Sequence, residues 1–243
     1  MSENTMVLYG RNSVCERLKA NPKSIEKVFI QDGFSSPHIE RLIRQNNVPS
    51  ERFSPRQLSK MKNAKDLQGI VAKVDKFSYA EFHYLLDLPK EEQLTLIFLD
   101  RINDPQNLGV IMRTAACFGG FAIVIPKFSA CGVTESVLHV ASGGENFVPV
   151  SMVSNISSAI IKAKKKNYWI MGAVLSDDAQ EISKISLPFP LGLVLGSEGE
   201  GIRYGIDKQI DIRARIPMKG AGLSFNVAMA GTIFCHEIAK QRK

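Results

Sequence analysis

The second part of the sequence alternates short apolar runs with amphipathic stretches, and this alternation restricts the possible folds more than any other feature. Six apolar runs have the length of buried strands: 94–99, 121–125, 147–150, 168–175, 191–195 and 210–216. Helical periodicity separates most of them, over 107–118, 134–141, 156–165 and 225–240. The pattern predicts an α/β fold with a largely parallel sheet and helices on both faces. Such sheets bind ligands in loops beyond the carboxyl ends of their strands.

The first part of the sequence predicts a separate, small α/β unit. Helical spacing over 12–20 and 37–45 combines there with strand-like runs at 27–30 and 69–72. The stretch 77–93 ends in a proline and a cluster of charges, which is typical of a linker. We therefore predict a domain over 1–76, a linker over 77–93 and a second domain over 94–243.

The positive charge is concentrated in the first domain. The chain has 31 lysines and arginines against 24 acidic residues, a net charge of +7. Residues 1–76 hold 14 basic and 8 acidic residues (+6), 77–93 hold 1 and 4 (−3), and 94–243 hold 16 and 12 (+4). Five basic residues gather in one stretch: Arg52, Arg56, Lys60, Lys62 and Lys65. This stretch is either a solvated face or a surface that contacts the phosphates of a nucleic acid.

Other classes of protein are disfavoured by composition. Hydrophobic residues make up 44% and charged residues 23% of the chain, which excludes a disordered or fibrous protein. The first residues lack the pattern of a secretory signal, and no apolar run approaches the roughly 20 residues that span a bilayer. The four cysteines and four histidines are scattered without metal-ligand spacing. We expect a cytoplasmic protein that binds neither a membrane nor a metal.

The loop after the run 94–99 contains two candidate functional residues. Asp104 and Pro105 form a turn signal before a helix, and Asn107 follows them. Asn107 is either a helix cap or a functional amide, and Arg113 is either a surface charge or a functional cation. Because six residues separate them, their side chains need not touch.

The loop after 191–195, LGSEGEGI, resembles a nucleotide-binding loop only superficially. Its glycine spacing is G-x-x-G-x-G, whereas a dinucleotide fold requires G-x-G-x-x-G. This spacing disfavours a nucleotide-dependent oxidoreductase. Glu198 and Glu200 also place negative charges where a phosphate cradle has none. The loop suits a cationic or neutral ligand, or it is a structural turn with solvated acids.

The last loop, IPMKGAGLSFN, offers apolar side chains beside free backbone groups. Ser224 and Asn226 open the final helix, either as caps or as functional residues. The apolar residues Ile216, Met218 and Phe225 would suit a ring such as adenine, with hydrogen bonds from the backbone.

Taken in order, the three loops resemble one known family. N-x-x-x-x-x-x-R-T-A after a strand, then L-G-S-E-G-E-G, then I-P-M-x-G-x-x-x-S-x-N-V resemble the SpoU (TrmH-like) class of the SPOUT methyltransferase superfamily. The N-terminal segment, with Tyr9-Gly10-Arg-Asn-Ser-Val14 and Gln68-Gly69-Ile70, resembles the small ribosomal-protein-like RNA-binding domain of many members. This layout is most similar to the bacterial 23S rRNA guanosine 2′-O-ribose methyltransferases.

The resemblance implies a fold, a reaction and a set of site residues. It implies methyl transfer from S-adenosylmethionine to a ribose 2′-hydroxyl of RNA, most closely a 23S rRNA guanosine. It also implies a C-terminal trefoil knot and a homodimer whose active site uses both subunits. By the motif match, the catalytic positions are Asn107, Arg113, Glu198, Ser224 and Asn226. The cofactor would lie against Gly196, Ile216, Met218 and Phe225.

Two alternatives to this function remain at the level of the sequence: ribose methylation of tRNA, and a non-catalytic RNA-binding protein of ribosome assembly. The resemblance assigns Arg113 to activation of the hydroxyl, with Asn107 positioning it. A guanidinium has a pKa above about 12, so Arg113 is a poor base and a better ligand for the neighbouring phosphate and ribose. Departures from the family pattern, such as Phe225 in place of leucine, concern the target nucleotide rather than the reaction.

Overall fold

The computed structural model describes residues 4–64, 66–221 and 223–242, so Lys65 lies outside the described residues. The chain forms two compact units. Unit 1 comprises Met1–Ser78 and Val133–Phe147, and unit 2 comprises Tyr79–Gly132 and Val148–Lys243. The segment 133–147 therefore groups with the N-terminal part, although it lies between two strands of unit 2 in the sequence.

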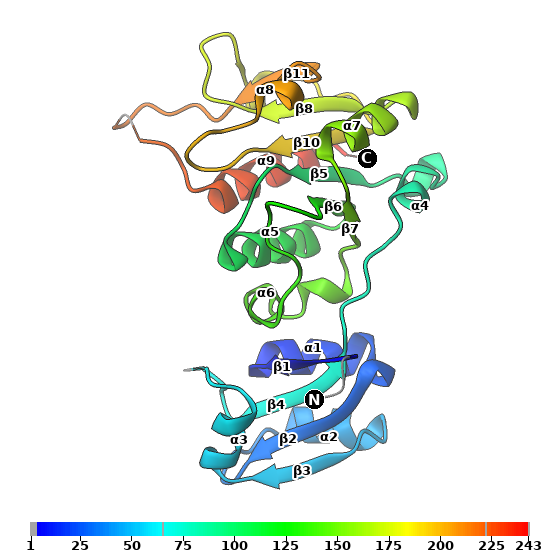
Figure 1. The fold of residues 1–243 in the computed structure, drawn as a ribbon, viewed down its shortest axis with the longest axis vertical. Coiled ribbons are helices and arrows are strands. Elements are labelled where there is room, and N and C mark those ends of the chain that lie inside the picture. The colour runs from blue at the N-terminus through cyan, green and yellow to red at the C-terminus, as the bar shows by residue number, and fades with distance from the viewer. Residues whose placement is uncertain (1–3, 65, 222, 243) are drawn as a thin grey trace. The chain divides into compact units, whose positions relative to one another are not determined.

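Unit 1 is built around a four-stranded sheet with the order β1-β4-β2-β3 (Figure 1). Its elements are β1 (Thr5–Tyr9), α1 (Arg11–Ala20), η1 (Pro22–Ser24), β2 (Ile25–Gln31), α2 (Pro37–Gln45), β3 (Ser50–Phe53), α3 (Pro55–Met61), β4 (Ile70–Asp75), α6 (Glu135–Ala141) and η3 (Gly144–Asn146). Strand β4 pairs antiparallel with β1 and β2, whereas β3 pairs parallel with β2. The α/β character predicted for the N-terminal part is therefore observed.

Several elements of unit 1 escaped sequence analysis, among them β3 and α3, for different reasons. Strand β3 (SERF) is polar and mostly exposed, so it has no apolar signal and is set by pairing with β2. Helix α3 is short, and its start is marked by Ser54, whose side chain forms a capping box with Gln57. The capping box and the following proline at the first helical position were the available signal.

Polar and aromatic contacts hold the segment 133–147 within unit 1. The carboxylate of Glu135 accepts a 2.6 Å hydrogen bond from the ammonium of Lys62. The ring of His139 stacks on that of Tyr9, with centroids 4.2 Å apart and an angle of 12° between the planes. These contacts join a segment that follows the sixth strand of the chain to the first strand and to the end of α3.

Unit 2 contains a seven-stranded sheet with the order β7-β6-β5-β10-β8-β11-β9, and every pairing described in it is parallel. Its strands are β5 (Thr95–Leu99), β6 (Phe121–Pro126), β7 (Val150–Val153), β8 (Trp169–Ala173), β9 (Gln180–Glu181), β10 (Leu191–Leu195) and β11 (Ile212–Arg215). Its helices are α4 (Phe82–Leu86), η2 (Lys90–Glu92), α5 (Pro105–Phe118), α7 (Ile156–Lys165), η4 (Ile182–Lys184), α8 (Tyr204–Asp207) and α9 (Val227–Gln241). The predicted α/β fold with a mostly parallel sheet is confirmed.

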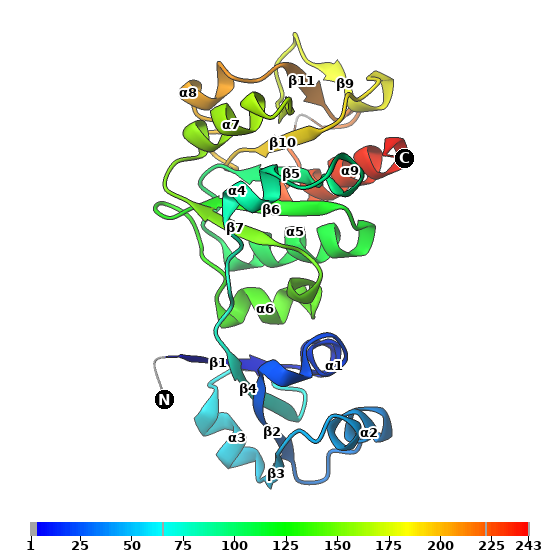
Figure 2. The ribbon, with the colours of Figure 1, turned by 90° about the vertical axis from the view of Figure 1, so that its right-hand side faces the viewer.

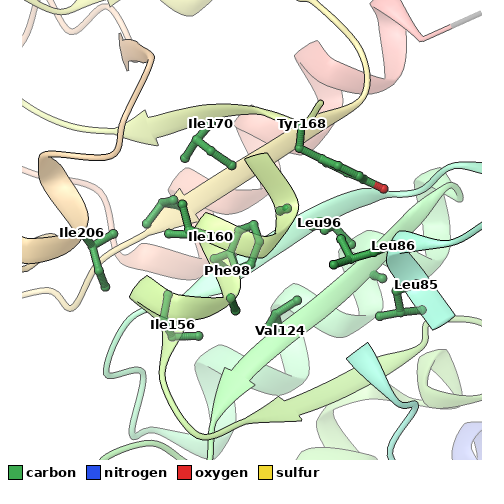
Figure 3. Close-up of a cluster of buried hydrophobic side chains, with 14 residues drawn as sticks. Leu85, Leu86, Leu96, Phe98, Val124, Ile156, Ile160, Tyr168, Ile170 and Ile206 are labelled. Carbon is green, nitrogen blue, oxygen red and sulfur yellow. The ribbon is translucent and has the colours of Figure 1, made fainter. Parts of the chain in front are cut away.

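Helices cover both faces of this sheet (Figure 2). Successive side chains of a strand point to opposite faces, so Phe98 and Val124 share one face while Leu195 points to the other. Figure 3 shows the first face, where side chains of α4, α7 and α8 pack on the strands, among them Leu85 and Ile160. On the other face, α5 and α9 lie side by side, and a Cβ added to Gly231 of α9 would meet Leu195.

One predicted strand is wrong. The run 147–150 is not a strand; the strand begins at Val150 and continues to Val153. The preceding residues form the turn η3, where the side chain of Asn146 donates to the carbonyl of Gly143 at 2.8 Å. Phe147 is 59% exposed and ends this turn, so its apolar side chain misled the sequence pattern.

The predicted linker region 77–93 contains helix α4, whose residues Leu85 and Leu86 are buried in the core of unit 2. The structure groups most of this region with unit 2, beginning at Tyr79. Among the residues that the structure describes, no helix is long and apolar enough to cross a membrane.

Candidate functional site

The three loops singled out in the sequence meet beyond the carboxyl ends of three strands. Strand β5 leads into the segment before α5, β10 leads into the loop 196–203, and β11 leads into the loop before α9. Strands β5 and β10 are parallel neighbours, so their carboxyl ends lie at one edge of the sheet (Figure 1). This is the edge at which α/β sheets bind ligands.

One residue from each loop contributes to a shared hydrogen-bond network. The amide of Asn226 donates to Glu198 Oε1 at 2.5 Å and to Asn107 Oδ1 at 2.9 Å. The amide of Asn107 donates to the same Glu198 Oε1 at 3.2 Å. The carboxylate of Glu198 thus joins the starts of α5 and α9, through two asparagines that are 119 positions apart in the sequence. The network holds the three loops in one arrangement.

The structure separates the capping roles that the sequence left open. Asp104 caps α5, because its carboxylate accepts from the backbone N–H of Gln106 at 2.9 Å. Asn107 lies inside the first turn, is buried and is therefore not a cap. Asn226 is a cap as well as a network member: its Oδ1 accepts from the N–H groups of Ala228 and Met229 at 2.9 and 3.3 Å. Ser224 precedes this cap and lines the pocket instead.

A pocket of about 450 Å³ lies beside the network. Loops after β8, β10 and β11 line it, together with the start of α9. Six residues predicted for the site are among those that line it: Gly196, Glu198, Ile216, Met218, Ser224 and Phe225. The apolar wall from Ile216 and Phe225, beside the glycine backbone of 196–201, has the mixed character of a small-molecule site.

The loop after β10 requires glycine at position 196. A Cβ at Gly196 would lie 2.2 Å from the backbone carbon of Gly201, because the loop folds back on itself there. Ser197 and Gly201 form an isolated bridge across the turn. The close approach of two backbone segments therefore explains the glycine at 196, and no role in phosphate binding is needed to account for it.

Two residues of this loop, Glu200 and Arg203, are tied to the segment after β5. The carboxylate of Asp100, fully buried, accepts from the backbone N–H of Arg203 at 3.0 Å and from its Nε at 2.8 Å. The next residue, Arg101, forms an ion pair with Glu200. The two acids of the loop thus differ in role, because Glu200 is paired with an arginine while Glu198 holds two amides. Sequence analysis missed Asp100; its signal was a carboxylate directly after a strongly apolar strand.

A second arginine shapes the far side of the pocket. Arg213 of β11 donates to both carboxylate oxygens of Asp207 at 2.9 and 3.0 Å and to the hydroxyl of Ser176 at 3.4 Å. Its Nε lies 3.0 Å from a carboxylate oxygen of Asp178. The hydrogen bonds to Asp207 raise the pKa of this guanidinium above its usual value. Arg213 therefore connects the loop after β8 to α8, a role that the sequence did not indicate.

Arg113 lies apart from the pocket of its own chain. It is exposed on α5, nearly two turns beyond Asn107, and is not among the described residues that line the pocket. The structure thus brings together eight of the nine predicted site residues, as pocket or network members, and leaves Arg113 on a helix surface.

Comparison with known proteins identifies the family. Residues 94–236 match the model of the SpoU rRNA Methylase family, and residues 7–80 match the model described as RNA 2′-O ribose methyltransferase substrate binding. The chain belongs to the SpoU rRNA methylase family. It is an S-adenosylmethionine-dependent RNA 2′-O-ribose methyltransferase.

Similar proteins match this SpoU-family chain over nearly its whole length. The 23S rRNA (guanosine-2′-O-)-methyltransferase RlmB of Coxiella burnetii is 33% identical, over 97% of this chain and 96% of that protein. A Staphylococcus epidermidis protein named for the TrmH family of tRNA/rRNA methyltransferases is 32% identical, over 98% and 96%. The fold is also that of the SpoU methyltransferase AviRb from Streptomyces viridochromogenes in complex with AdoMet (TM-score 0.80, 18% identity, 98% of this chain and 90% of that one).

The pocket suits the cofactor of this SpoU-family enzyme. S-Adenosylmethionine combines an adenine ring with a positively charged sulfonium. The apolar wall of Ile216 and Phe225 suits the ring, and the carboxylate of Glu198 at the pocket suits a cationic ligand. The volume of about 450 Å³ falls in the usual range for small-molecule sites. These residues would hold the cofactor, which supplies an activated methyl group when bound.

Proposed function

We propose that this enzyme methylates the 2′-hydroxyl of a guanosine in 23S rRNA. The support is the match to RlmB of Coxiella burnetii, which extends over 97% of this chain and so includes the N-terminal unit. The excess of positive charge in residues 1–76 supports RNA binding by that unit. Methylation of tRNA is the second candidate, because the name of the Staphylococcus epidermidis relative includes both RNA classes. Action on either RNA favours a cytoplasmic protein.

We further propose the division of roles that the motif match indicates. Gly196, Ile216, Met218 and Phe225 contact the cofactor, and Ser224, which lines the same pocket, is a catalytic position. Asn107, Glu198 and Asn226 hold the loops in register through their shared network. Alignment of the attacking oxygen with the methyl group dominates such a transfer, so a rigid network contributes directly to the rate.

Arg113 is proposed to hold the target nucleotide rather than to accept its proton. A guanidinium is a planar group with several N–H donors, so Arg113 binds the phosphate and ribose oxygens through charge-assisted hydrogen bonds. The hydroxyl proton then leaves through a phosphate oxygen, or after the transfer. Arg113 acts on the substrate by position and charge.

The enzyme is proposed to work as a homodimer in which Arg113 of one subunit completes the pocket of the other. Two observations support this. The pocket includes no Arg113 among the described residues that line it, and α5 and α9 together present an exposed apolar surface. That surface includes Val110, Phe118 and Met229, which are 37%, 38% and 61% exposed. A surface of this kind is typical of an interface between subunits.

A C-terminal trefoil knot is part of the same proposal. Strand β10 lies between β5 and β8 although it follows both in the sequence, and α9 returns to pack against α5. Such a return of the chain fits a knot, in which one segment passes through a loop formed by another, and few folds contain one.

Mixed dimers of two inactive variants test the shared site. Arg113→Ala keeps its pocket, and Gly196→Val keeps its arginine while it disrupts the loop that lines the pocket, because the added side chain meets the backbone of Gly201. If Arg113 acts across the interface, mixing the two restores transfer to RNA, since one of the two sites is then intact. If Arg113 acts within its own chain, the mixture stays inactive. The RNA substrate is 23S rRNA or tRNA from cells that lack the enzyme, and mapping of the 2′-O-methylated nucleotide identifies the target.

A further inference from the structure

Two exposed aromatic side chains of unit 2 each carry a lysine over the ring. Phe128, two residues after the end of β6, is 69% exposed, and Tyr204, the first residue of α8, is 74% exposed. The ammonium of Lys127 lies 5.7 Å from the centroid of the Phe128 ring, and that of Lys208 lies 4.3 Å from the Tyr204 centroid. A single exposed aromatic residue is common on a protein surface. Here the same pair of an aromatic ring and a cation occurs twice.

The sheet order places both pairs next to the catalytic loops. Strands β6, β5 and β10 are adjacent and parallel, and Phe98 of β5 is level with Val124 of β6 and with Val194 of β10. Their carboxyl ends therefore lie at the same edge. Phe128 leaves this edge after β6, and Tyr204 follows the loop that leaves it after β10. The segment between β5 and α5, which leads to Asn107, lies between them in the strand order.

Hydrogen bonds fix both pairs relative to that segment. The backbone N–H of Cys131 donates to the carbonyl of Ile102 at 2.9 Å, which joins the Phe128 loop to the residues after β5. Arg203, next to Tyr204 in the chain, is held by the buried carboxylate of Asp100. The aromatic residues are thus parts of two loops anchored on one structural element.

The charges at this edge suit a polyanion. The carboxylate of Asp100 is buried against Arg203, whose side chain stays 45% exposed, and Glu200 is paired with Arg101. Within the described part of the chain, neither Lys127 nor Lys208 has a carboxylate partner in an ion pair. Asp100 and Glu200 are thus paired with arginines, and two lysines stand beside the aromatic rings.

We propose that Phe128 and Tyr204 are stacking platforms for bases of single-stranded RNA on either side of the methylated nucleotide, with Lys127 and Lys208 binding the adjacent phosphates. Aromatic platforms combined with cations are the usual means of holding single-stranded RNA, because every base has a flat face. Recognition of RNA sequence also concentrates on unpaired nucleotides. The proposal rests on RNA being the substrate, and it assigns residues that contact nucleotides other than the reacting one.

The test measures RNA binding by ring-deleting variants. The probe is a single-stranded RNA of about twelve nucleotides with 2-aminopurine near its centre, whose fluorescence falls when the base stacks. Phe128→Ala and Tyr204→Ala should each weaken binding about fivefold to a hundredfold and reduce the quenching. Tyr204→Phe keeps the ring and should bind as the wild type does. Tyr84→Ala is the matched control, because Tyr84 is 65% exposed but lies on α4. The residue after α4, Asp87, pairs with Lys166 just before β8 begins, which places the end of α4 near the opposite edge of the sheet.

Further measurements separate this proposal from the enzyme's activity. Affinity for S-adenosylmethionine and the unfolding midpoint should not change in the ring variants, since both side chains are exposed. If the wild-type enzyme methylates RNA while Phe128→Ala and Tyr204→Ala keep its RNA affinity and its KM for RNA, the platforms are refuted and the activity stands. If no RNA is methylated but the ring variants still lose RNA affinity, the activity fails and the platforms stand. RNA binding that is equal in the wild type and both ring variants overturns the proposal.

Discussion

Replacement of Asn226 should reveal how much the shared network stabilises the enzyme. In Asn226→Ala, α9 loses its cap, which costs about 1 kcal/mol of the free energy of unfolding. The carboxylate of Glu198 also loses its shortest hydrogen bond, at 2.5 Å. A hydrogen bond to a charged group contributes about 1.5 to 3 kcal/mol, and partial exposure of this site favours the lower value. Together the losses amount to about 2.5 kcal/mol.

Two further variants at this position separate the cap from the network. Asn226→Ser keeps a capping oxygen but removes the amide donor, so it should lose about 1.5 kcal/mol. Asn226→Asp also keeps the cap, but it places a second carboxylate beside that of Glu198. Repulsion between the two raises the pKa of one of them in the folded state. A raised carboxyl pKa means that stability is lost as the pH rises through that pKa, so Asn226→Asp should approach Asn226→Ser in acid and fall below it at neutral pH.

Urea denaturation at several pH values measures these differences, and titration calorimetry measures the affinity for S-adenosylmethionine. Asn226→Ala should be the least stable at acidic pH, and all three variants should bind the cofactor more weakly, because the loop with Glu198 is less well held. Equal stability of Asn226→Ser and the wild type would show that the amide donor contributes nothing. A pH profile of Asn226→Asp parallel to that of Asn226→Ser would refute the proximity of the two carboxylates.

Four further predictions concern packing and buried groups. Arg17 and Glu145 form a buried ion pair at 3.2 Å. Glu145→Ala leaves the arginine buried without its partner, so it should lower the free energy of unfolding, measured by urea denaturation, by about 3 to 5 kcal/mol. The double variant Arg17→Met, Glu145→Leu removes both charges, so its free energy of unfolding should be close to that of the wild type. Burial raises the pKa of Glu145, so the wild type should lose stability as the pH rises through that pKa and Glu145→Gln should lose less. Burial also raises the pKa of Cys235 to about 12. A thiol reagent at pH 8 should therefore label the exposed Cys117 and leave Cys235 unmodified until the chain unfolds. Equal labelling rates at the two cysteines would contradict this prediction. Gly196→Ala should weaken binding of S-adenosylmethionine at least tenfold by calorimetry, because the added Cβ meets backbone at 2.2 Å; unchanged affinity would show that the loop can open.

Most elements of unit 2 could be predicted from the sequence because they are buried and regular. The run 191–195 is a central strand covered on both faces, so its composition alone indicates it. The strand expected at 147–150 failed because an exposed Phe147 continued an apolar pattern into a turn. Local sequence does not distinguish an apolar residue that is buried from one that is exposed, and the partner strand decides the boundary.

The candidate site was predicted as three separate loops, but their connections were not. Asn107 could be interpreted as a cap, because an amide near a helix start fits that role equally well. The structure assigns the cap to Asp104 and directs Asn107 toward Glu198. Asp100 and Arg203 are 103 positions apart, and only folding brings these charges together. The roles of the site residues remain predictions, to be decided by the variants described above.

By itself, the sequence determined the fold class, the three motif loops and the concentration of positive charge in residues 1–76, because each depends on residues that are near one another in the chain. The tertiary structure decided which side chains meet. The parallel order β6-β5-β10-β8-β11 brings loops that are about a hundred residues apart to one edge of the sheet. It also joined the segment 133–147 to unit 1 and left Arg113 outside the pocket of its own chain. Such contacts depend on strand order, and no local pattern of residue types encodes it.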